Sequence, residues 1–218
     1  WAEFDWRRAD DRAQPPWRRF DRPTWRGGDV AGRRLLLYAE QGLGDTLQFV
    51  RYVPLVAARG ARVVLEVQGP LRTLLANGTG AERVIARGDP LPDFDLECPL
   101  MSLPRAFGTR LDSVPAAVPY LRPDPQRAAA WRRRLAGEGP AVGLVWAGNP
   151  HFPGDRLRSP RLEGLRPVLD VAGVRFFGLQ AGEGRADLAG ARLPASFTDL
   201  GGDLGDFADI AAVMAGLD

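Results

Sequence analysis

The chain has 218 residues, of which 45% are hydrophobic, 26% charged and 9% aromatic, and its formal net charge is +2. This composition is typical of a globular protein, and so small a net charge gives no indication of nucleic-acid binding. The single cysteine and the single histidine exclude an internal disulfide and a Cys-based or multi-histidine metal site.

All 29 basic residues are arginines. The absence of lysine excludes Schiff-base chemistry, pyridoxal-phosphate anchoring and a Walker A loop. Any bound anion must therefore contact guanidinium groups, backbone N–H groups or hydroxyls. No apolar run approaches the roughly 18 to 20 residues of a membrane-spanning helix, so no transmembrane segment is expected.

Tryptophan is concentrated at the N-terminus: Trp1, Trp6, Trp17 and Trp25 lie among arginines and prolines. We interpret residues 1–28 as a linker or docking segment in which each indole ring anchors an irregular stretch on a neighbouring domain. An aromatic surface for stacking bases is the alternative, but the interleaved acidic residues oppose phosphate binding. The chain starts without Met or a signal peptide, and we expect it to be a piece of a longer protein.

Strand and helix patterns alternate along the chain. Strands are expected at residues 34–39, 62–67, 83–86, 95–98, 141–147 and 175–180. Helices are expected at 45–59, bent or split at Pro54, and at 70–77, 126–136, 162–171 and 206–216. Residues 99–123 are rich in proline and are expected to form loops and short turns.

This alternation predicts an α/β protein with parallel sheets in two tandem Rossmann-like domains. The N-terminal domain is expected at 29–123, a connecting helix at 124–139, and a partial C-terminal domain at 140–218. The second domain is expected to be truncated, because the chain stops where another strand should begin.

A glycine-containing turn follows the first strand and precedes a helix, which is where α/β proteins bind ligands. Gly42 and Gly44 are expected to allow close approach of a ligand or to adopt positive φ. One interpretation is a dinucleotide fingerprint in which Glu66 binds a ribose, but Leu47 stands where the third glycine belongs.

Asp45 has two interpretations that the spacing leaves open. Placed at the crevice, its carboxylate could take a proton from an acceptor hydroxyl. Alternatively, Asp45 lies at or near the N-cap and accepts hydrogen bonds from the backbone N–H groups of Leu47 and Gln48.

Residues 40–52 (EQGLGDTLQFVRY) closely resemble a stretch of bacterial tetratricopeptide-repeat proteins. Those proteins carry a C-terminal glycosyltransferase-like region related to the lipopolysaccharide heptosyltransferases and to O-GlcNAc-transferase-like enzymes. Further matching segments occur in order at residues 64–68, 94–95, 99–104, 142–150, 158–159 and 206–209. The resemblance covers nearly the whole chain, including the Trp/Arg-rich opening.

The resemblance implies a GT-B fold, with the acceptor mainly on the first domain and a nucleotide-sugar donor mainly on the second. It implies that Asp45 is the catalytic base and that Gln41, Gly42 and Gly44 shape the acceptor-side loop. The residues expected to bind the donor and its phosphates are Asn149, Arg156, Arg158, Ser159 and Gln180.

Each of these donor residues has a plainer interpretation. The loop after the fifth strand could be solvated, with arginines paired to nearby acids and His151 making only a polar contact. Gln180 could cap a strand end. Asp93-Phe94-Asp95 is interpreted as a turn before a strand and not as a metal–diphosphate motif. No metal or cofactor is expected, because arginines can stabilise a departing diphosphate.

The expected function is inverting transfer of a sugar from a nucleotide diphosphate to a hydroxyl of a glycan, lipid or protein. Tetratricopeptide repeats are expected in the parent chain, which is expected to be cytoplasmic or peripheral at the inner membrane. Family members continue into a strand and an Asp-Thr-x-x-x-His segment that this sequence lacks, so the 218-residue chain alone is expected to be inactive. The alternatives are a non-catalytic glycan-binding, nucleotide-binding or scaffold module, and an NAD-binding protein.

Overall fold

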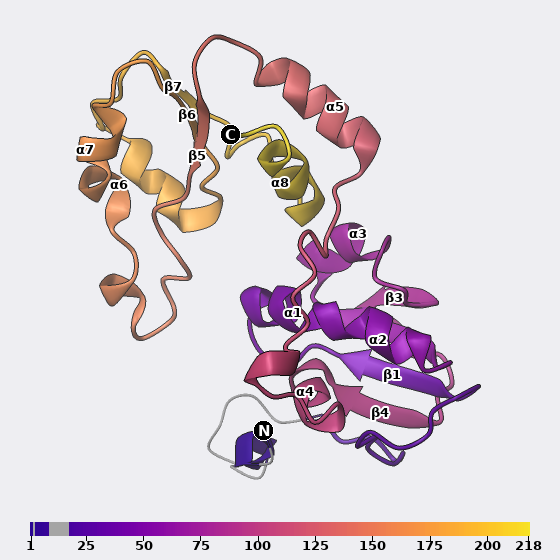
Figure 1. Ribbon diagram of the computed structural model, residues 1–218. Coiled ribbons are helices and arrows are strands. Elements are labelled where there is room, and N and C mark those ends of the chain that lie inside the picture. The colour runs from indigo at the N-terminus through magenta and orange to yellow at the C-terminus, as the bar shows by residue number, and fades with distance from the viewer. Residues whose placement is uncertain (2, 9–17) are drawn as a thin grey trace. The chain divides into compact units, whose positions relative to one another are not determined.

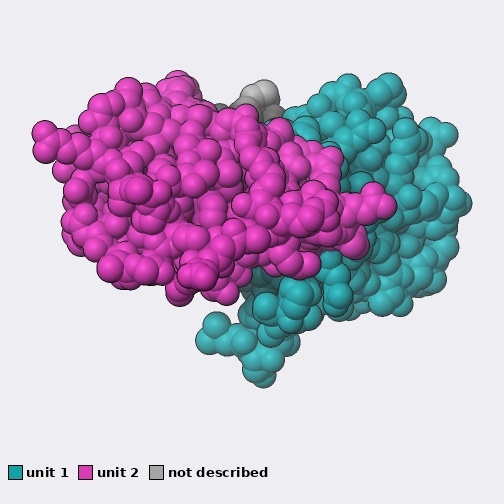
Figure 2. Space-filling model, turned by 90° about the horizontal axis from the view of Figure 1, so that it is seen from above, with its two compact units in different colours: residues 1–122 teal, residues 123–218 magenta. Residues whose placement is uncertain are grey.

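The computed structural model describes residues 1, 3–8 and 18–218. The anchoring role expected of Trp17 therefore lies outside the described residues. The chain forms two compact units, Trp1–Arg122 and Pro123–Asp218, which are coloured separately in Figure 2.

The first unit contains a four-stranded sheet in which every neighbouring pair is parallel (Figure 1). Its strands are β1 (Arg34–Tyr38), β2 (Arg62–Val67), β3 (Arg83–Ala86) and β4 (Leu96–Pro99), in the order β3-β2-β1-β4. Most side chains of β1 and β2 are buried, which explains why both strands are nearly continuous apolar runs. The strands expected here are confirmed, with β4 displaced by one residue.

Short helices connect the strands of the first unit. They are η1 (Glu3–Arg8), α1 (Leu43–Phe49), η2 (Val50–Tyr52), α2 (Val53–Ala58), η3 (Gly69–Leu71), α3 (Arg72–Leu75), η4 (Leu100–Ser102), α4 (Leu103–Ala106) and η5 (Leu111–Ser113). The helix expected at 45–59 is split into α1 and α2 by η2, just before Pro54, and it begins at Leu43 and not at Asp45. Pro54 lies in the first turn of α2, where a missing backbone N–H costs nothing.

The second unit contains a three-stranded parallel sheet in the order β5-β6-β7. Its elements are α5 (Pro125–Arg134), β5 (Ala141–Leu144), η6 (Asp155–Leu157), α6 (Arg161–Gly164), α7 (Arg166–Leu169), β6 (Arg175–Gly178), η7 (Gly182–Leu188), β7 (Phe197–Asp199) and α8 (Phe207–Met214). Helices α5 and α8 pack together through Trp131, Ala212 and Val213, which are all buried. The helix at 124–139 thus belongs to the core of this unit.

Three expectations for the second unit are corrected. Strand β5 ends at Leu144 and not at residue 147, because the backbone of the next residues bonds to a side chain and not to a strand. The helix expected at 162–171 is divided into α6 and α7 at Leu165, and Pro167 lies in the first turn of the second piece. Strand β7 was not expected, since its three residues form too short a pattern to recognise.

Candidate functional site

Helix α1 begins directly after the loop that leaves β1, and Asp45 lies in its first turn. Gly42 is the N-cap, so Asp45 lies near the N-cap as expected, but its carboxylate does not accept from Leu47 and Gln48 N–H as expected. Asp45 is instead the third helical residue, and its Oδ2 accepts a hydrogen bond of 2.9 Å from the backbone N–H of Gly42. Its side chain therefore points back to the start of its own helix and is half-buried.

Neither glycine of this loop has a positive φ, so the second of the two roles expected for them is not observed. Gly42 has φ −71° and ψ 169°, and Gly44 is not among the positive-φ residues. A Cβ atom at Gly44 would meet nothing within 4 Å. The space beside Gly44 is therefore open, and its role in the close approach of a ligand stays a prediction.

Gln68 holds the loop in place, a role that sequence reasoning missed. Its Nε2 donates a hydrogen bond of 2.8 Å to the carbonyl of Gln41, and its Oε1 accepts one of 2.9 Å from Thr46 Oγ1. Gln68 follows β2 directly, and a polar residue at the end of a buried strand is the signal that points to it. Through Gln68, the loop after β1 is tied both to the end of β2 and to α1.

Two buried glutamates near the carboxyl ends of the strands pair with arginines of the N-terminal segment. Arg7 Nη2 lies 2.6 Å from Glu40 Oε2, and Arg18 pairs with Glu66, which is 1% exposed. Glu66 is therefore occupied by Arg18, and the interpretation of Glu66 as a ribose ligand in a dinucleotide site is wrong.

Within the N-terminal segment, η1 is anchored through Asp5 and Arg7. Asp5 accepts hydrogen bonds of 2.7 Å from Ser102 and 2.8 Å from Arg105, and it also pairs with Arg7 at 2.9 Å. Burial acts to raise the pKa of Asp5, but these three hydrogen bonds outweigh it and lower the pKa below its ordinary value. Trp1 also lies edge-on to Phe49 of α1, with the ring centroids 6.2 Å apart.

The loop after β5 contains the polar residues expected to bind a donor. Asn149 is exposed, and its Oδ1 accepts a hydrogen bond of 3.0 Å from the backbone N–H of His151. Ser159 is buried, and its Oγ accepts one of 2.9 Å from Gly148 N. Both side chains thus fix the course of the loop.

The two arginines of this loop differ in their surroundings. Arg158 Nε donates to Asp155 Oδ1 at 3.2 Å, and its guanidinium lies 4.4 Å from the centroid of the Phe152 ring. Arg156 is exposed and has no hydrogen bond or ion pair with any residue that the structure describes. Arg158 is therefore held in position, whereas the guanidinium of Arg156 is available to an incoming anion.

Gln180 has the geometry of a strand-end cap. The side chain is buried, and its Oε1 accepts hydrogen bonds from the backbone N–H groups of Trp146 at 3.0 Å and Ala147 at 2.9 Å. Its Nε2 donates to the carbonyl of Ala181 at 2.9 Å. Gln180 therefore joins the carboxyl ends of β5 and β6, and its contact with a donor stays a prediction.

Arg161, the first residue of α6, pairs with Asp187 of η7, and sequence reasoning missed this contact. Arg161 has φ +61°, a conformation that non-glycine residues rarely adopt. Its side chain makes two hydrogen bonds to Asp187, and Asp187 also accepts one of 3.1 Å from the backbone N–H of Leu162. The hydrogen bond from Arg161 lowers the pKa of Asp187. No local sequence signal indicates this pair.

The two units thus carry the same arrangement: polar groups and backbone N–H groups in the loop that leaves the first strand of a parallel sheet. The carboxyl ends of such strands are where α/β folds bind ligands. Among the described residues, no group of His, Cys, Asp or Glu is suited to hold a metal ion. Within the same part of the chain, no helix is both long and apolar enough to cross a bilayer.

No model of a known protein family matches this sequence. The sequence is 31% identical over 246 residues to Protein FlbA of Caulobacter vibrioides; the match covers 100% of this chain and 41% of FlbA. The chain therefore spans less than half the length of this relative.

The structure is similar to that of the glycosyl transferase family 9 protein from Veillonella parvula, with a TM-score of 0.53 and 7% identity, over 87% of this chain and 74% of that one. The glycosyltransferase TibC of enterotoxigenic E. coli is a weaker match, with a TM-score of 0.45 and 12% identity, over 78% of this chain and 48% of TibC. At this identity, structural likeness establishes the fold and not the activity. Together with the parallel sheets of the two units, the first likeness shows that the chain has the Rossmann-type, GT-B-like α/β fold of the glycosyltransferases.

Proposed function

We propose that this chain is part of a glycosyltransferase that moves a sugar, with inversion, from a nucleotide diphosphate to an acceptor hydroxyl. The observation that carries the proposal is the pair of polar loops after β1 and β5, on a fold shared with a family 9 glycosyltransferase. We propose further that the donor is a nucleotide sugar and that the acceptor is a glycan, lipid or protein. We also propose that the parent chain is longer and carries tetratricopeptide repeats.

In the proposed reaction, Asp45 takes the proton of the acceptor hydroxyl as that oxygen attacks the sugar. One carboxylate oxygen is already hydrogen-bonded to Gly42 N, which fixes the orientation of the group. The other oxygen, Oδ1, has no hydrogen-bond partner among the residues that the structure describes and could accept the proton. General-base assistance of this kind contributes about 10²–10⁴ in rate.

The departing diphosphate would be stabilised by Arg156 and Arg158, with Asn149, Ser159 and Gln180 shaping the loop. Arginine can bind a phosphate through two parallel hydrogen bonds, and such contacts stabilise developing negative charge without a metal. The unpartnered guanidinium of Arg156 supports its assignment to the donor. Arg158 would use its Nη groups, since its Nε is bonded to Asp155.

A non-catalytic module that binds a glycan or nucleotide is the second candidate. The observation in its favour is the hydrogen bond from Gly42 N–H to Asp45, because a carboxylate at this position also serves as an ordinary helix cap. In that case the loops after β1 and β5 would bind ligand without promoting transfer.

The test is turnover by the full-length parent protein with a panel of UDP-, GDP-, ADP- and CMP-sugars, measured as nucleotide release. Turnover is expected from the longer chain and not from these 218 residues alone. Asp45→Asn should lower turnover by about 10²–10⁴-fold, because the amide cannot take the proton but can still accept from Gly42 N–H. Asp112→Asn, at an exposed aspartate of the same unit, is the matched control and should leave turnover unchanged.

The result discriminates between the two candidates. Turnover that is unchanged in Asp45→Asn would remove the proposed base. Binding of a nucleotide sugar without any release of nucleotide would favour the non-catalytic module.

A further inference from the structure

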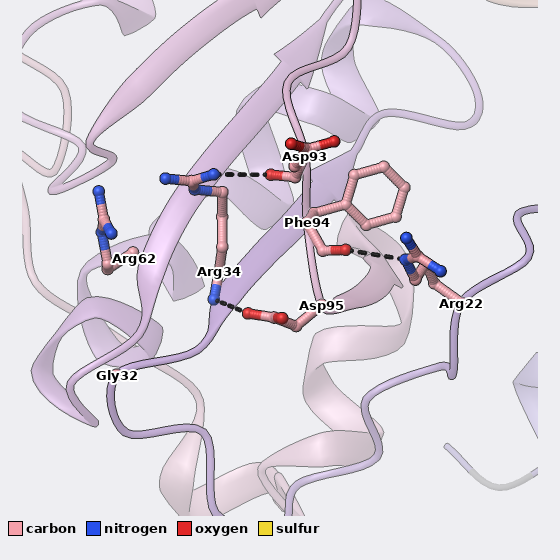
Figure 3. A pocket seen from close by; sticks show the side chains of 7 residues that line it. All are labelled: Arg22, Gly32, Arg34, Arg62, Asp93, Phe94 and Asp95. Atoms are coloured by element: carbon pink, nitrogen blue, oxygen red, sulfur yellow. Dashed lines mark hydrogen bonds between the residues drawn. The ribbon is translucent and has the colours of Figure 1, made fainter.

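A second candidate site lies at the amino ends of the strands of the first unit. A hollow of about 480 Å³ is lined there by three arginines together with Gly32 and the segment Asp93–Phe94–Asp95 (Figure 3). Arg34 begins β1 and Arg62 begins β2. The loop that contains Asp45 follows the opposite end of β1, so this hollow and the proposed transfer site are separate.

The sheet places two arginines of this hollow side by side. Arg34 and Arg62 are direct partners in the parallel register of β1 and β2, so their side chains leave the same face of the sheet. Two like charges at directly opposite positions destabilise a sheet unless an anion lies between or beside them. The strand β3 also begins with an arginine, Arg83, so three adjacent strands place positive charge at this edge.

Among the residues that the structure describes, a carboxylate is hydrogen-bonded to the guanidinium of only one of the three arginines that line the hollow. Arg62 makes two hydrogen bonds of 2.9 Å to Glu82. Arg34 Nη1 donates to the carbonyl of Asp93 at 3.1 Å, and Arg22 Nε donates to the carbonyl of Phe94 at 3.0 Å. A neutral carbonyl fixes the position of a guanidinium without itself neutralising the charge.

Three carboxylates lie near these arginines: Asp93 and Asp95 line the hollow, and Glu82 is bonded to Arg62. The hydrogen bond from Arg62 lowers the pKa of Glu82, and the charge of Arg34 lowers it further. The pKa of Asp95 is lowered first by the hydrogen bond from the backbone N–H of Arg34 and then by the charges of Arg33 and Arg34. The side chains of the hollow thus favour the negative form of a nearby acid.

The segment that anchors these arginines is itself firmly held. Asp95 exchanges two hydrogen bonds with Arg34: its Oδ2 accepts from Arg34 N at 2.8 Å, and its N–H donates to Arg34 O at 2.8 Å. The ring of Phe94 packs edge-on against Phe20, with centroids 5.5 Å apart. The guanidiniums of Arg22 and Arg34 are therefore positioned before any ligand arrives, which reduces the entropy cost of binding.

We propose that this hollow binds the phosphate group of a small phosphorylated ligand. Arg34 Nε and Nη2, together with Arg62 Nη1, have no partner among the described residues and supply donors from two adjacent strands. Gly32, with φ +72°, contributes no side chain to the hollow. The exposed carboxylate of Asp93 lies at its edge and weakens the attraction for an anion.

The test is isothermal titration calorimetry of the 218-residue chain at low ionic strength, with inorganic phosphate, glucose 6-phosphate and glucose as probes. Both phosphates should bind, and glucose should not. Arg34→Gln should weaken binding by about tenfold or more, since it removes a charged hydrogen-bond donor. The matched control Arg110→Gln, at an exposed arginine of the same unit, should leave the affinity unchanged.

Asp93→Asn should increase the affinity for phosphate by about two- to fivefold, because it removes a negative charge that repels the anion. A folding defect would lower the affinity and cannot produce this result. Phosphate affinity that is unaffected by both Arg34→Gln and Asp93→Asn would overturn the proposal. Affinity lost in Arg158→Gln but retained in Arg34→Gln would also overturn it, by placing the bound phosphate in the loop after β5. Neither result would bear on Asp45 and sugar transfer.

Discussion

Gln180 shows how much one buried amide can contribute to the second unit. Strand β5 ends at Leu144, and the backbone N–H groups of Trp146 and Ala147 then depend on Gln180 Oε1 for their hydrogen bonds. A buried N–H group without a partner costs about 1–3 kcal/mol. This side chain therefore stabilises the loop from which Asn149, Arg156 and Arg158 extend.

We expect Gln180→Leu to lower the free energy of unfolding of the second unit by about 2–4 kcal/mol, because two buried N–H groups lose their acceptor. Urea denaturation followed by tryptophan fluorescence measures the change. Gln126→Leu, at an exposed glutamine of the same unit, is the control and should change stability by less than about 0.5 kcal/mol. Equal effects of the two substitutions would contradict the assigned role of Gln180.

At the scale of elements, η1 is joined to the first unit by charge more than by apolar packing. Asp5 lies within the element and is bonded to Ser102 and Arg105, while Arg7 is bonded to Glu40. Trp6 is 72% exposed and contributes little burial. The attachment of η1 should therefore depend on pH through Asp5.

The pKa of Asp5 is lowered in the folded chain from its unfolded value of 3.8, and this determines in which direction the attachment of η1 changes with pH. A carboxyl with a depressed pKa in the folded state contributes its full stabilisation above the unfolded value and loses it as pH falls through the folded one. At pH 7, Asp5→Asn should therefore increase the rate of proteolysis near η1 several-fold. This difference from the unsubstituted chain should disappear as the pH falls below the folded pKa of Asp5.

Limited proteolysis measures the attachment of η1 to the first unit. Pepsin serves as the protease at low pH. Glu3→Gln is the control, because Glu3 is exposed. A difference between Asp5→Asn and the unsubstituted chain that stays constant from neutral to acid pH would show that Asp5 does not anchor η1 through its charge.

At the scale of the whole molecule, each unit has a sheet and a core of its own. Two compact units of this kind are expected to unfold in two transitions.

A pair of glycines in the second unit allows this expectation to be tested with two closely similar substitutions. Gly139 and Gly173 have φ of +77° and +78°, but only at Gly139 would an added Cβ clash, 2.2 Å from the carbonyl oxygen of Gly173.

Alanine at either position should cost about 1–2 kcal/mol, because a side chain in the left-handed region is strained. Gly139→Ala should cost about 1–3 kcal/mol more, because the backbone must move to accommodate the Cβ. Calorimetry should show that only the transition of the second unit shifts. A single transition that shifts as a whole would indicate that the two units unfold together.

The sequence by itself predicted the α/β class and most strands of both sheets. Strands such as β1 and β2 are buried on both faces, so their residues are apolar regardless of what lies far away in the chain. It also placed the polar loops after β1 and β5, because a strand end followed by glycine is a local pattern. The interruption of the helix after Asp45 is also signalled locally, by Pro54, whereas the short strand β7 carries too weak a local signal.

Only the tertiary structure decided which side chains meet. Arg7 and Glu40 are 33 residues apart, and Arg34 and Arg62 become neighbours solely through the register of β1 and β2. Likewise, the helix start at Leu43 and not at Asp45 determines that this carboxylate bonds to Gly42 N–H. Local patterns determine which segments form strands and helices. Contacts between distant residues depend instead on strand register and on where the chain turns back, and a short stretch of sequence specifies neither.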